Sequence, residues 1–335
     1  MASSPSCGQD ATPIIARVIL LAVGYHYVAA EPPREPRAIF PVTTAGLAAQ
    51  LELIGRSFEF VSRDELLAAV AGEGTLPERA CIVTFDDGLR CQLELAPPVL
   101  ERLGVPAIFF VPAKPLAEQR ALYVHKVHAL RERVPDEELL GLAGARDVPL
   151  ELAQEHYRYD EPAAARLKYL LNMALPLVER EQVVGAAFAE FFPDEEAFVR
   201  EWYMSRADVA GLERAQGAVG AHSYAHEPLA LLDDAALVAD LDACASVLEE
   251  ISGTRPLALS YPHGTAGTVD LRVARHAAAA EFRVAFTMER ALNRTLEEPL
   301  LLGRLDANDA PGGKRPLDEI PPGRSRYFAE RVPAA

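Results

Sequence analysis

The sequence has few cysteines, and their positions exclude two kinds of site. Only four of the 335 residues are cysteine, and none of them shows the C-x-x-C spacing typical of a thiolate metal site. A disulfide framework is not expected either, because the four are scattered, and unpaired thiols favour a reducing compartment. We therefore expect a cytoplasmic protein. The cysteines are Cys7, Cys81, Cys91 and Cys244.

Basic residues are also in the minority. The chain has 33 Lys and Arg against 49 Asp and Glu, which gives a formal net charge of −16. Such a balance repels phosphate backbones and anionic membrane surfaces, so we expect neither nucleic acid nor lipid as a partner. An acidic balance is also common among soluble enzymes.

Long uncharged apolar runs are missing as well. The strongest candidate, Ile14–Val28, contains Arg17 and continues into Gly24 without a small-residue cleavage site. No Lys or Arg precedes it in Met1–Pro13, as a secretory leader would require. The run is therefore predicted to be a buried first strand. No other segment has membrane-spanning length without charge, so no membrane insertion is expected.

What the chain does contain is an alternation of short apolar runs with amphipathic stretches. This alternation predicts parallel βα units, hence an α/β fold: a distorted (β/α) barrel of about seven to eight strands, with an open doubly wound sheet as the alternative. Thr43, Ser62 and Ser205 are predicted to start helices. The predicted strands are Val18–Val23, Phe58–Val61, Ala80–Phe85, Ala107–Val111, Ala218–Ala221, Leu257–Ser260, Arg283–Phe286 and Leu300–Leu305. The predicted helices are Thr44–Ile54, Arg63–Val70, Leu93–Leu103, Arg206–Ala215, Asp233–Ile251 and Asp270–Ala280.

One segment interrupts this alternation. Residues 116–203 are rich in Ala, Leu, Glu and Arg and have no β-branched run of strand length. We interpret them as a helical insertion in a barrel domain that spans residues 14–310. Because the insertion follows a strand directly, we expect it to cover the barrel mouth and shape the substrate pocket. Residues 311–335, rich in Gly and Pro, are predicted to form an irregular tail.

Three short motifs follow predicted strands. Thr84-Phe85-Asp86-Asp87-Gly88 places two carboxylates side by side, although Asp-Asp-Gly turns are common on surfaces. His222-Ser223-Tyr224-Ala225-His226 spaces two imidazoles as a metal chelate requires, although such pairs are often incidental. Tyr261-Pro262-His263-Gly264 has the composition of a rigid loop that presents a main-chain N–H, or of a plain β-turn.

The three motifs gain weight because they converge. All of them follow the carboxyl ends of predicted parallel strands, where barrel active sites are built. One Asp and two His form a ligand set that leaves metal positions open for water and substrate, and the second Asp remains available as a base.

With these motifs the sequence resembles the polysaccharide deacetylase family (carbohydrate esterase family 4). The resemblance covers residues 20–111 and 205–305. It implies a distorted (β/α) barrel that hydrolyses N-acetyl groups, with a metal held by Asp87, His222 and His226 and with Asp86 as the catalytic base. We expect Zn²⁺, with Co²⁺, Ni²⁺ or Mn²⁺ as alternatives.

The sequence departs from the family at its end. Members commonly carry a general-acid His there, whereas this chain reads Leu300-Leu301-Leu302-Gly303-Arg304-Leu305-Asp306. We therefore expect His263 to be the acid, with His125 or Asp86 itself as alternatives. His125 and His128 are expected either to reach the site from the insertion or to lie on a helix surface, and His26 either to line the pocket or to pack at a strand end. Arg304 is expected to orient Asp86, to bind substrate or to pair structurally.

The expected activity is removal of an N-acyl group, typically acetyl, from a small amino sugar. Asp86 accepts a proton from the attacking water, and a backbone N–H of the Tyr261-Pro262-His263 loop stabilises the oxyanion. Substrate contacts are expected from Tyr261, Pro262, His125 and Arg304. Two alternatives are an amidohydrolase of a non-sugar amide or ureide and an inactive carbohydrate-binding protein. The oligomeric state is not predicted.

Overall fold

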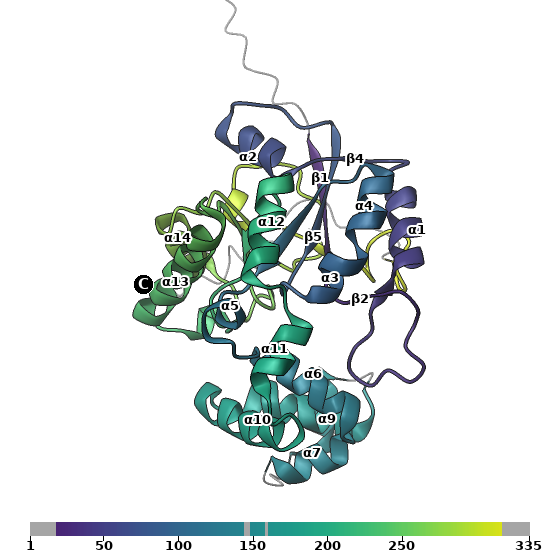
Figure 1. Ribbon diagram of the computed structural model, residues 1–335, viewed down its shortest axis with the longest axis vertical. Helices are drawn as coiled ribbons and strands as arrows, with labels where there is room; N and C mark the ends of the chain where they lie inside the picture. Colours follow the sequence, from purple (N-terminus) through teal and green to yellow (C-terminus); the bar gives the residue numbers. More distant parts are fainter. Residues whose placement is uncertain (1–17, 144–147, 158–159, 317–335) are drawn as a thin grey trace, which may run out of the picture.

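The computed structural model describes residues 18–143, 148–157 and 160–316. Its centre is a sheet in which every named pair of neighbouring strands is parallel, in the order β10-β1-β5-β6-β7-β8-β9, with β4 beside the start of β5 (Figure 1). A parallel bridge from Phe286 of β9 to Leu302, three residues before β10, brings the two edges together. The predicted distorted (β/α) barrel is therefore confirmed. The strands are β1 (Ile19–Tyr25), β4 (Glu59–Phe60), β5 (Arg79–Phe85), β6 (Ala107–Val111), β7 (Val219–Ala221), β8 (Ala258–Ser260), β9 (Val284–Phe286) and β10 (Leu305–Asp306).

Alternating side chains on these strands form two cores, as the two-residue period of a strand requires. Leu20 and Ala22 of β1 belong to the same buried cluster as Ile82, Ile108 and Phe286, which lines the inside of the barrel. Leu21 and Val23 belong to a larger cluster that the surrounding helices cover. Those helices are α1 (Thr44–Ile54), α3 (Arg90–Leu95), α4 (Pro97–Leu103), α5 (Lys114–Glu118), α12 (Arg206–Gln216), α13 (Asp234–Ser252) and α14 (Leu271–Ala279). The helix α2 (Arg63–Ala71) instead packs against the first cluster, to which its Leu66 belongs.

The helix starts are where the sequence predicts them. The Thr43 hydroxyl accepts from the Gly46 N–H, and Ser62 and Ser205 each form a reciprocal capping box with the acid three residues on. Two boundaries were wrong. The helix predicted at Leu93–Leu103 is two helices, because Pro97 has no N–H and starts a new one. Pro299 likewise begins a 3₁₀ turn, η3 (Pro299–Leu301), so the last strand starts only at Leu305.

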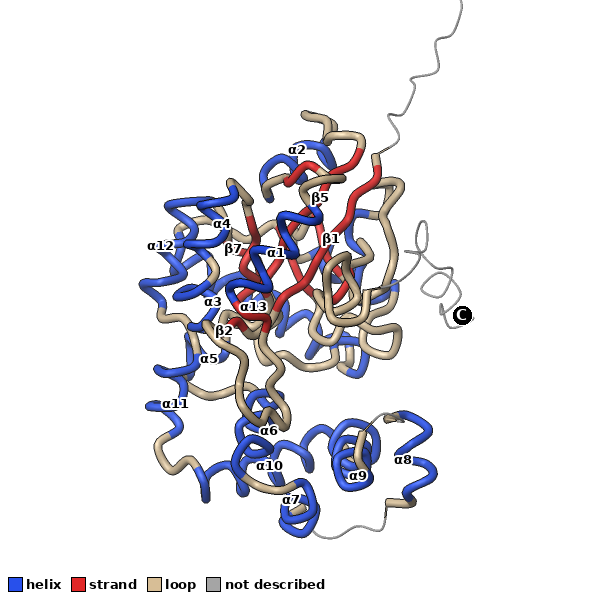
Figure 2. The backbone as a smooth tube through the Cα atoms, turned by 90° about the vertical axis from the view of Figure 1, so that its right-hand side faces the viewer, coloured by secondary structure: helices blue, strands red, loops and turns tan. Residues whose placement is uncertain are grey.

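Helices also fill the chain between β6 and α12, and they pack into a unit with its own apolar core. In both views this unit lies at one end of the molecule, opposite α2 (Figures 1 and 2). Its helices are α6 (Tyr123–Arg133), α7 (Asp136–Leu142), α8 (Leu150–His156), α9 (Pro162–Tyr169) with a π-helical turn η1 (Leu170–Ala174), α10 (Leu177–Phe191) and α11 (Glu195–Trp202). We call it the insertion.

The short strands β2 (Val28–Ala29) and β3 (Val42–Thr43) pair with each other and carry the loop of residues 30–41 between them. A second 3₁₀ turn, η2 (Leu229–Leu231), precedes α13. Among the described residues, no helix is both long and apolar enough to cross a membrane. Most of the predicted tail, and the first four residues of the predicted barrel domain, lie outside the described residues.

Candidate metal and catalytic site

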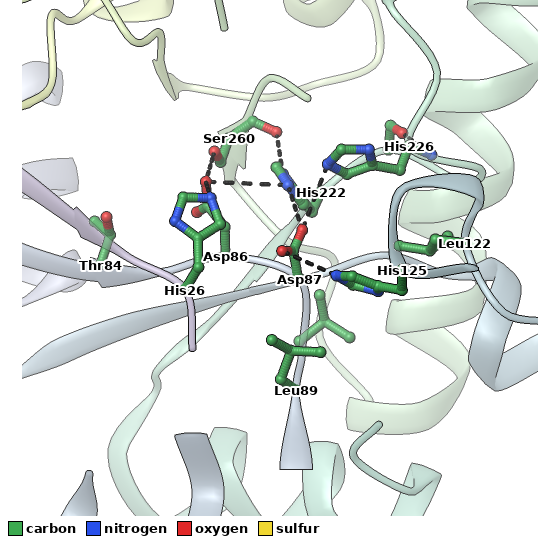
Figure 3. Close-up of polar contacts among 12 residues, drawn as sticks. His26, Thr84, Asp86, Asp87, Leu89, Leu122, His125, His222, His226 and Ser260 are labelled. Atoms are coloured by element: carbon green, nitrogen blue, oxygen red, sulfur yellow. Dashed lines mark hydrogen bonds and ion pairs between the residues drawn. The ribbon is translucent and has the colours of Figure 1, made fainter. Parts of the chain in front are cut away.

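Asp86 and Asp87 leave the end of β5 in different directions. Figure 3 shows Asp86 turned toward Ser260 and His26, and Asp87 toward His222, His226 and His125. The backbone makes this divergence because Asp87 has a φ of 79°, in the left-handed region that residues with a side chain rarely adopt. His226 and His263 have φ of 61° and 58°, so all three motifs hold a strained residue, as functional sites often do.

The ligands expected for a metal do come together. The Oδ1 atom of Asp87 lies 3.3 Å from Nε2 of His222 and 3.4 Å from Nε2 of His226. Ligand atoms about 2.0–2.1 Å from a tetrahedral metal would be separated by about 3.3 Å, which is close to both distances. The three ligand atoms all lie within 4.8 Å of one another.

Hydrogen bonds leave the facing atoms of this set free to bind a cation. Nδ1 of His222 lies 2.8 Å from the Ser260 carbonyl oxygen, which can only accept, so Nδ1 carries the proton and Nε2 offers its lone pair. Asp87 Oδ1 is buried and has no hydrogen-bond donor among the described residues. A buried oxygen without a donor is costly, and a cation at this point would satisfy it. The residues therefore fit a divalent metal such as zinc.

Asp86 is held as an ionised carboxylate. Burial by itself would raise its pKa, but the Arg304 guanidinium and nearby imidazoles lower the pKa below its usual value. Arg304 donates to both carboxylate oxygens, at 2.8 Å and 2.6 Å, and the Ser260 hydroxyl donates at 3.0 Å. Gly24 permits this, because a Cβ there would lie 3.2 Å from the guanidinium. Arg304 is fully buried against Asp86, where it orients that carboxylate, and it also borders the cavity.

The third motif supplies one unused main-chain donor. The Tyr261 N–H bonds to the Phe286 carbonyl, Pro262 has none, and the Gly264 N–H bonds to the Pro262 carbonyl. No hydrogen bond joins the His263 N–H to the part of the chain that the structure describes, so it is available to a ligand. The Tyr261 ring is buried and its hydroxyl donates to the Leu300 carbonyl, and Pro262 is buried as well, so both shape the loop.

The structure decides between the alternatives that the sequence left for His26 and His125. His26 does not pack at the strand end: its side chain is 38% exposed and its Nε2 lies 4.0 Å from Asp86, so it lines the cavity. His125 is not on a helix surface but reaches the site, fully buried with Nε2 3.2 Å from Asp87 Oδ2. His128 also turns inward and bonds to the Tyr27 hydroxyl. The insertion had to pack on the barrel to bring His125 and His128 to these positions, and no local pattern signals that packing.

The His263 ring packs edge-on against His226, with ring centroids 4.9 Å apart, and borders the cavity. The surrounding protein and the positive charge of Arg180 lower the pKa of His263 to about 4. Both His26 and His263 border the cavity, and His26, whose Nε2 lies 4.0 Å from Asp86, is the better-placed proton donor.

Comparison with known proteins agrees with this geometry. A family model described as polysaccharide deacetylase matches residues 186–285, a stretch that contains both histidine motifs. Over this stretch the chain is similar to the polysaccharide deacetylase family. The resemblance inferred from the sequence motifs is thereby confirmed. No match was found among curated proteins.

Solved structures share the fold of this chain. IcaB from Ammonifex degensii is 19% identical with a TM-score of 0.53, covering 86% of this chain and 91% of that one. A de-N-acetylase from Aggregatibacter actinomycetemcomitans is 17% identical with a TM-score of 0.51, covering 86% and 94%. The deacetylase PplD of Streptococcus pyogenes, solved with acetate, is 15% identical with a TM-score of 0.50, covering 87% and 92%.

Proposed function

We propose that this chain is a divalent-metal-dependent N-deacetylase that acts on a small amino sugar derivative. The observation that carries the proposal is the buried Oδ1 of Asp87, which has no donor and lies 3.3 Å and 3.4 Å from the imidazole nitrogens of His222 and His226. Asp86 lies beside these three residues and has separate hydrogen-bond partners. A catalytically inactive relative would be expected to lack one of these four side chains.

Each of these residues has a part in hydrolysing an amide. Asp87, His222 and His226 would hold the cation, which supplies water of lowered pKa and polarises the acyl carbonyl. Asp86, kept ionised by Arg304, accepts the proton of the attacking water. The His263 N–H donates to the oxyanion that forms on the carbonyl. His26, on the open side of Asp86, protonates the departing amine.

The cavity above the site favours a small substrate. Its volume is about 640 Å³, and it is bordered by the site residues, by the loop of residues 30–41 and by the segment 312–314. Pockets of this size bury ligands of a few hundred daltons. The three cysteines of the described residues are free, which supports a reducing compartment, the cytoplasm. We therefore propose a soluble amino sugar derivative over an extracellular polymer.

The test is acetate release from N-acetylated substrates that range from monosaccharides and nucleotide sugars to polymers. We expect the purified protein to lose activity after chelation and to regain it with Zn²⁺ or Co²⁺, with small substrates preferred. His222→Ala should bind no stoichiometric metal. His276→Ala, which removes an imidazole on α14 that pairs with Asp234, is the matched control and should bind metal like the wild type. A full metal equivalent in His222→Ala would disprove the site, and preference for polymer would disprove the substrate class.

A further inference from the structure

The second carboxylate oxygen of Asp87, Oδ2, has a hydrogen-bond partner of its own, and its role in metal binding rests on the proposed function. Oδ2 points away from the ligand set and lies 3.2 Å from Nε2 of His125, at the start of α6 in the insertion. His125 Nδ1 in turn lies 2.5 Å from the hydroxyl of Tyr203, at the other end of the insertion. The partner of Asp87 Oδ2 and the residue behind it thus both come from outside the barrel.

The donor and acceptor of each hydrogen bond in this chain can be assigned by starting from Leu122. The Leu122 backbone N–H can only donate, and it donates to the Tyr203 oxygen at 3.0 Å. The Tyr203 proton is then free to be donated to His125 Nδ1, which leaves the ring proton on Nε2, facing a carboxylate oxygen that can only accept. If the ring carried both protons, Nε2 would still donate to Asp87. His125 Nε2 is therefore a donor and has no lone pair for a metal.

The backbone fixes this arrangement from the barrel side. Tyr203 forms an antiparallel bridge with Leu89, and the Met204 N–H donates to the Gly88 carbonyl at 2.9 Å. The end of the insertion thus pairs with the residues that directly follow Asp87. Figure 3 shows the His125 ring beside Asp87, with His222 and His226 above them.

We propose that His125 and Tyr203 are positioning residues for the metal ligand Asp87. By engaging Oδ2 they make Asp87 a monodentate ligand through Oδ1, so the site keeps positions open for water and substrate. The insertion is then part of the metal site, because it supplies the hydrogen bond that orients a ligand of the barrel. Partners of this kind orient ligating groups and tune metal affinity in other metalloproteins.

Metal affinity of the full-length protein, measured by competition of the metal-free form with a fluorescent zinc chelator, tests this role directly. His125→Leu removes the donor to Oδ2, and we expect about 10–100-fold weaker zinc binding. Tyr203→Phe removes only the hydroxyl that orients the ring and should weaken binding less. His125→Gln, whose amide can still donate, should recover part of the loss. The matched control is Tyr123→Phe, which removes another buried tyrosine hydroxyl of the insertion, bonded to the Leu171 carbonyl.

A second readout reports the coordination itself. In the Co²⁺-substituted protein, release of Oδ2 would allow both oxygens of Asp87 to bind, and the higher coordination number would weaken the visible d–d absorption. We expect this weakening in His125→Leu and Tyr203→Phe but not in Tyr123→Phe.

The outcomes separate this inference from the proposed function. A wild-type protein that binds no zinc would overturn both. Wild-type affinity in Tyr203→Phe together with a large loss in His125→Leu would make His125 a direct ligand and reject the positioning role. If His125→Leu fails to fold, Tyr203→Phe decides alone: an unchanged zinc affinity in that variant would reject the positioning role.

Discussion

Two adjacent carboxylates need opposite surroundings if one is to accept a proton and the other to hold a cation. Asp86 receives a guanidinium and a hydroxyl from the barrel interior, through Arg304 and Ser260. Asp87 turns outward through a left-handed backbone and meets only imidazole nitrogens. At the scale of single residues, the division of labour therefore follows from which neighbours each oxygen reaches.

Replacing Asp86 should separate chemistry from metal binding. Asp86→Asn cannot accept the proton of water but keeps nearly the same shape, so we expect kcat to fall about 10²–10⁴-fold with zinc still bound. Steady-state acetate release and metal analysis measure the two effects. Asp306→Asn, the same change at another acid that borders the cavity, should leave kcat within a few-fold. Near-normal turnover in Asp86→Asn would remove this residue from the role of base.

The identity of the general acid can be decided by two matched changes. His26 lies with its Nε2 4.0 Å from Asp86, whereas the His263 ring packs against His226, so His26→Gln should abolish the alkaline limb of the kcat/KM profile and His263→Gln should retain it. Substrates with poor leaving amines should slow most in His26→Gln. If the limb survives in both variants, neither imidazole is the acid, and Asp86 must return the proton that it collected.

Much of this site could be predicted from sequence because its motifs are local and follow strands. Parallel strands bring their carboxyl ends to one rim, so Asp86, His222 and His263 had to approach each other once the strands were recognised. Arg304 carried a partial signal, since it is a charged residue in an otherwise apolar strand segment. His125 carried none, because its place depends on how a helical unit packs on the barrel.

At the scale of elements, the two ends of the insertion are held together by one carboxylate. Glu195, at the start of α11, accepts from Lys126 of α6 at 2.8 Å, from Arg120 at 2.6 Å and from the Ala121 N–H at 2.9 Å. These contacts fix α6, which carries His125, against α11, which leads to Tyr203. Helix positions of this kind arise from long-range pairing, and the sequence reasoning gave no sign of them.

The Glu195 contacts should make stability depend on pH. Burial opposes ionisation, but hydrogen bonds from Lys126 and Arg120 lower the pKa of Glu195 below its ordinary value. A lowered folded pKa contributes stability above the unfolded pKa of about 4.3, and that stability is lost as pH falls through the folded pKa. Glu195→Gln should therefore lower Tm by roughly 1–3 °C at pH 7 and by less at pH 4.

Thermal unfolding followed by circular dichroism measures this dependence. Glu196→Gln is the matched control, because Glu196 lies next in the chain and forms only an exposed pair with Arg200 at 3.7 Å. Exposed pairs contribute little, so its Tm should match the wild type at both pH values. An equal Tm loss in Glu195→Gln at pH 7 and pH 4 would show that the charge of Glu195 does not stabilise the insertion.

At the scale of the whole molecule, three parts of the chain border one cavity: the barrel rim, the loop of residues 30–41 and the insertion. The loop is fastened to the insertion by Glu132 of α6, whose Oε1 accepts the backbone N–H groups of Arg37, Ala38 and Ile39 at 3.1, 2.7 and 2.8 Å. The loop contributes Pro32, Pro33, Pro36 and Phe40 to the cavity wall. The insertion therefore shapes the substrate pocket in two ways: Val124 and His128 of α6 border it directly, and Glu132 sets the position of a loop that belongs to the barrel.

Releasing that loop should affect binding more than chemistry. Glu132→Ala removes the acceptor of three N–H groups and leaves Asp86, Asp87 and their partners in place. An unfastened loop must be ordered when substrate binds, and a cost of about 1.4 kcal/mol corresponds to a tenfold weaker affinity. We therefore expect KM for a small N-acetylated glycoside to rise about tenfold with kcat nearly unchanged.

Glu190→Ala, which removes an exposed acid of α10, should change neither constant. A fall in kcat with KM unchanged would mean that Glu132 acts on the catalytic groups, and equal constants in wild type and Glu132→Ala would mean that the loop does not bind substrate.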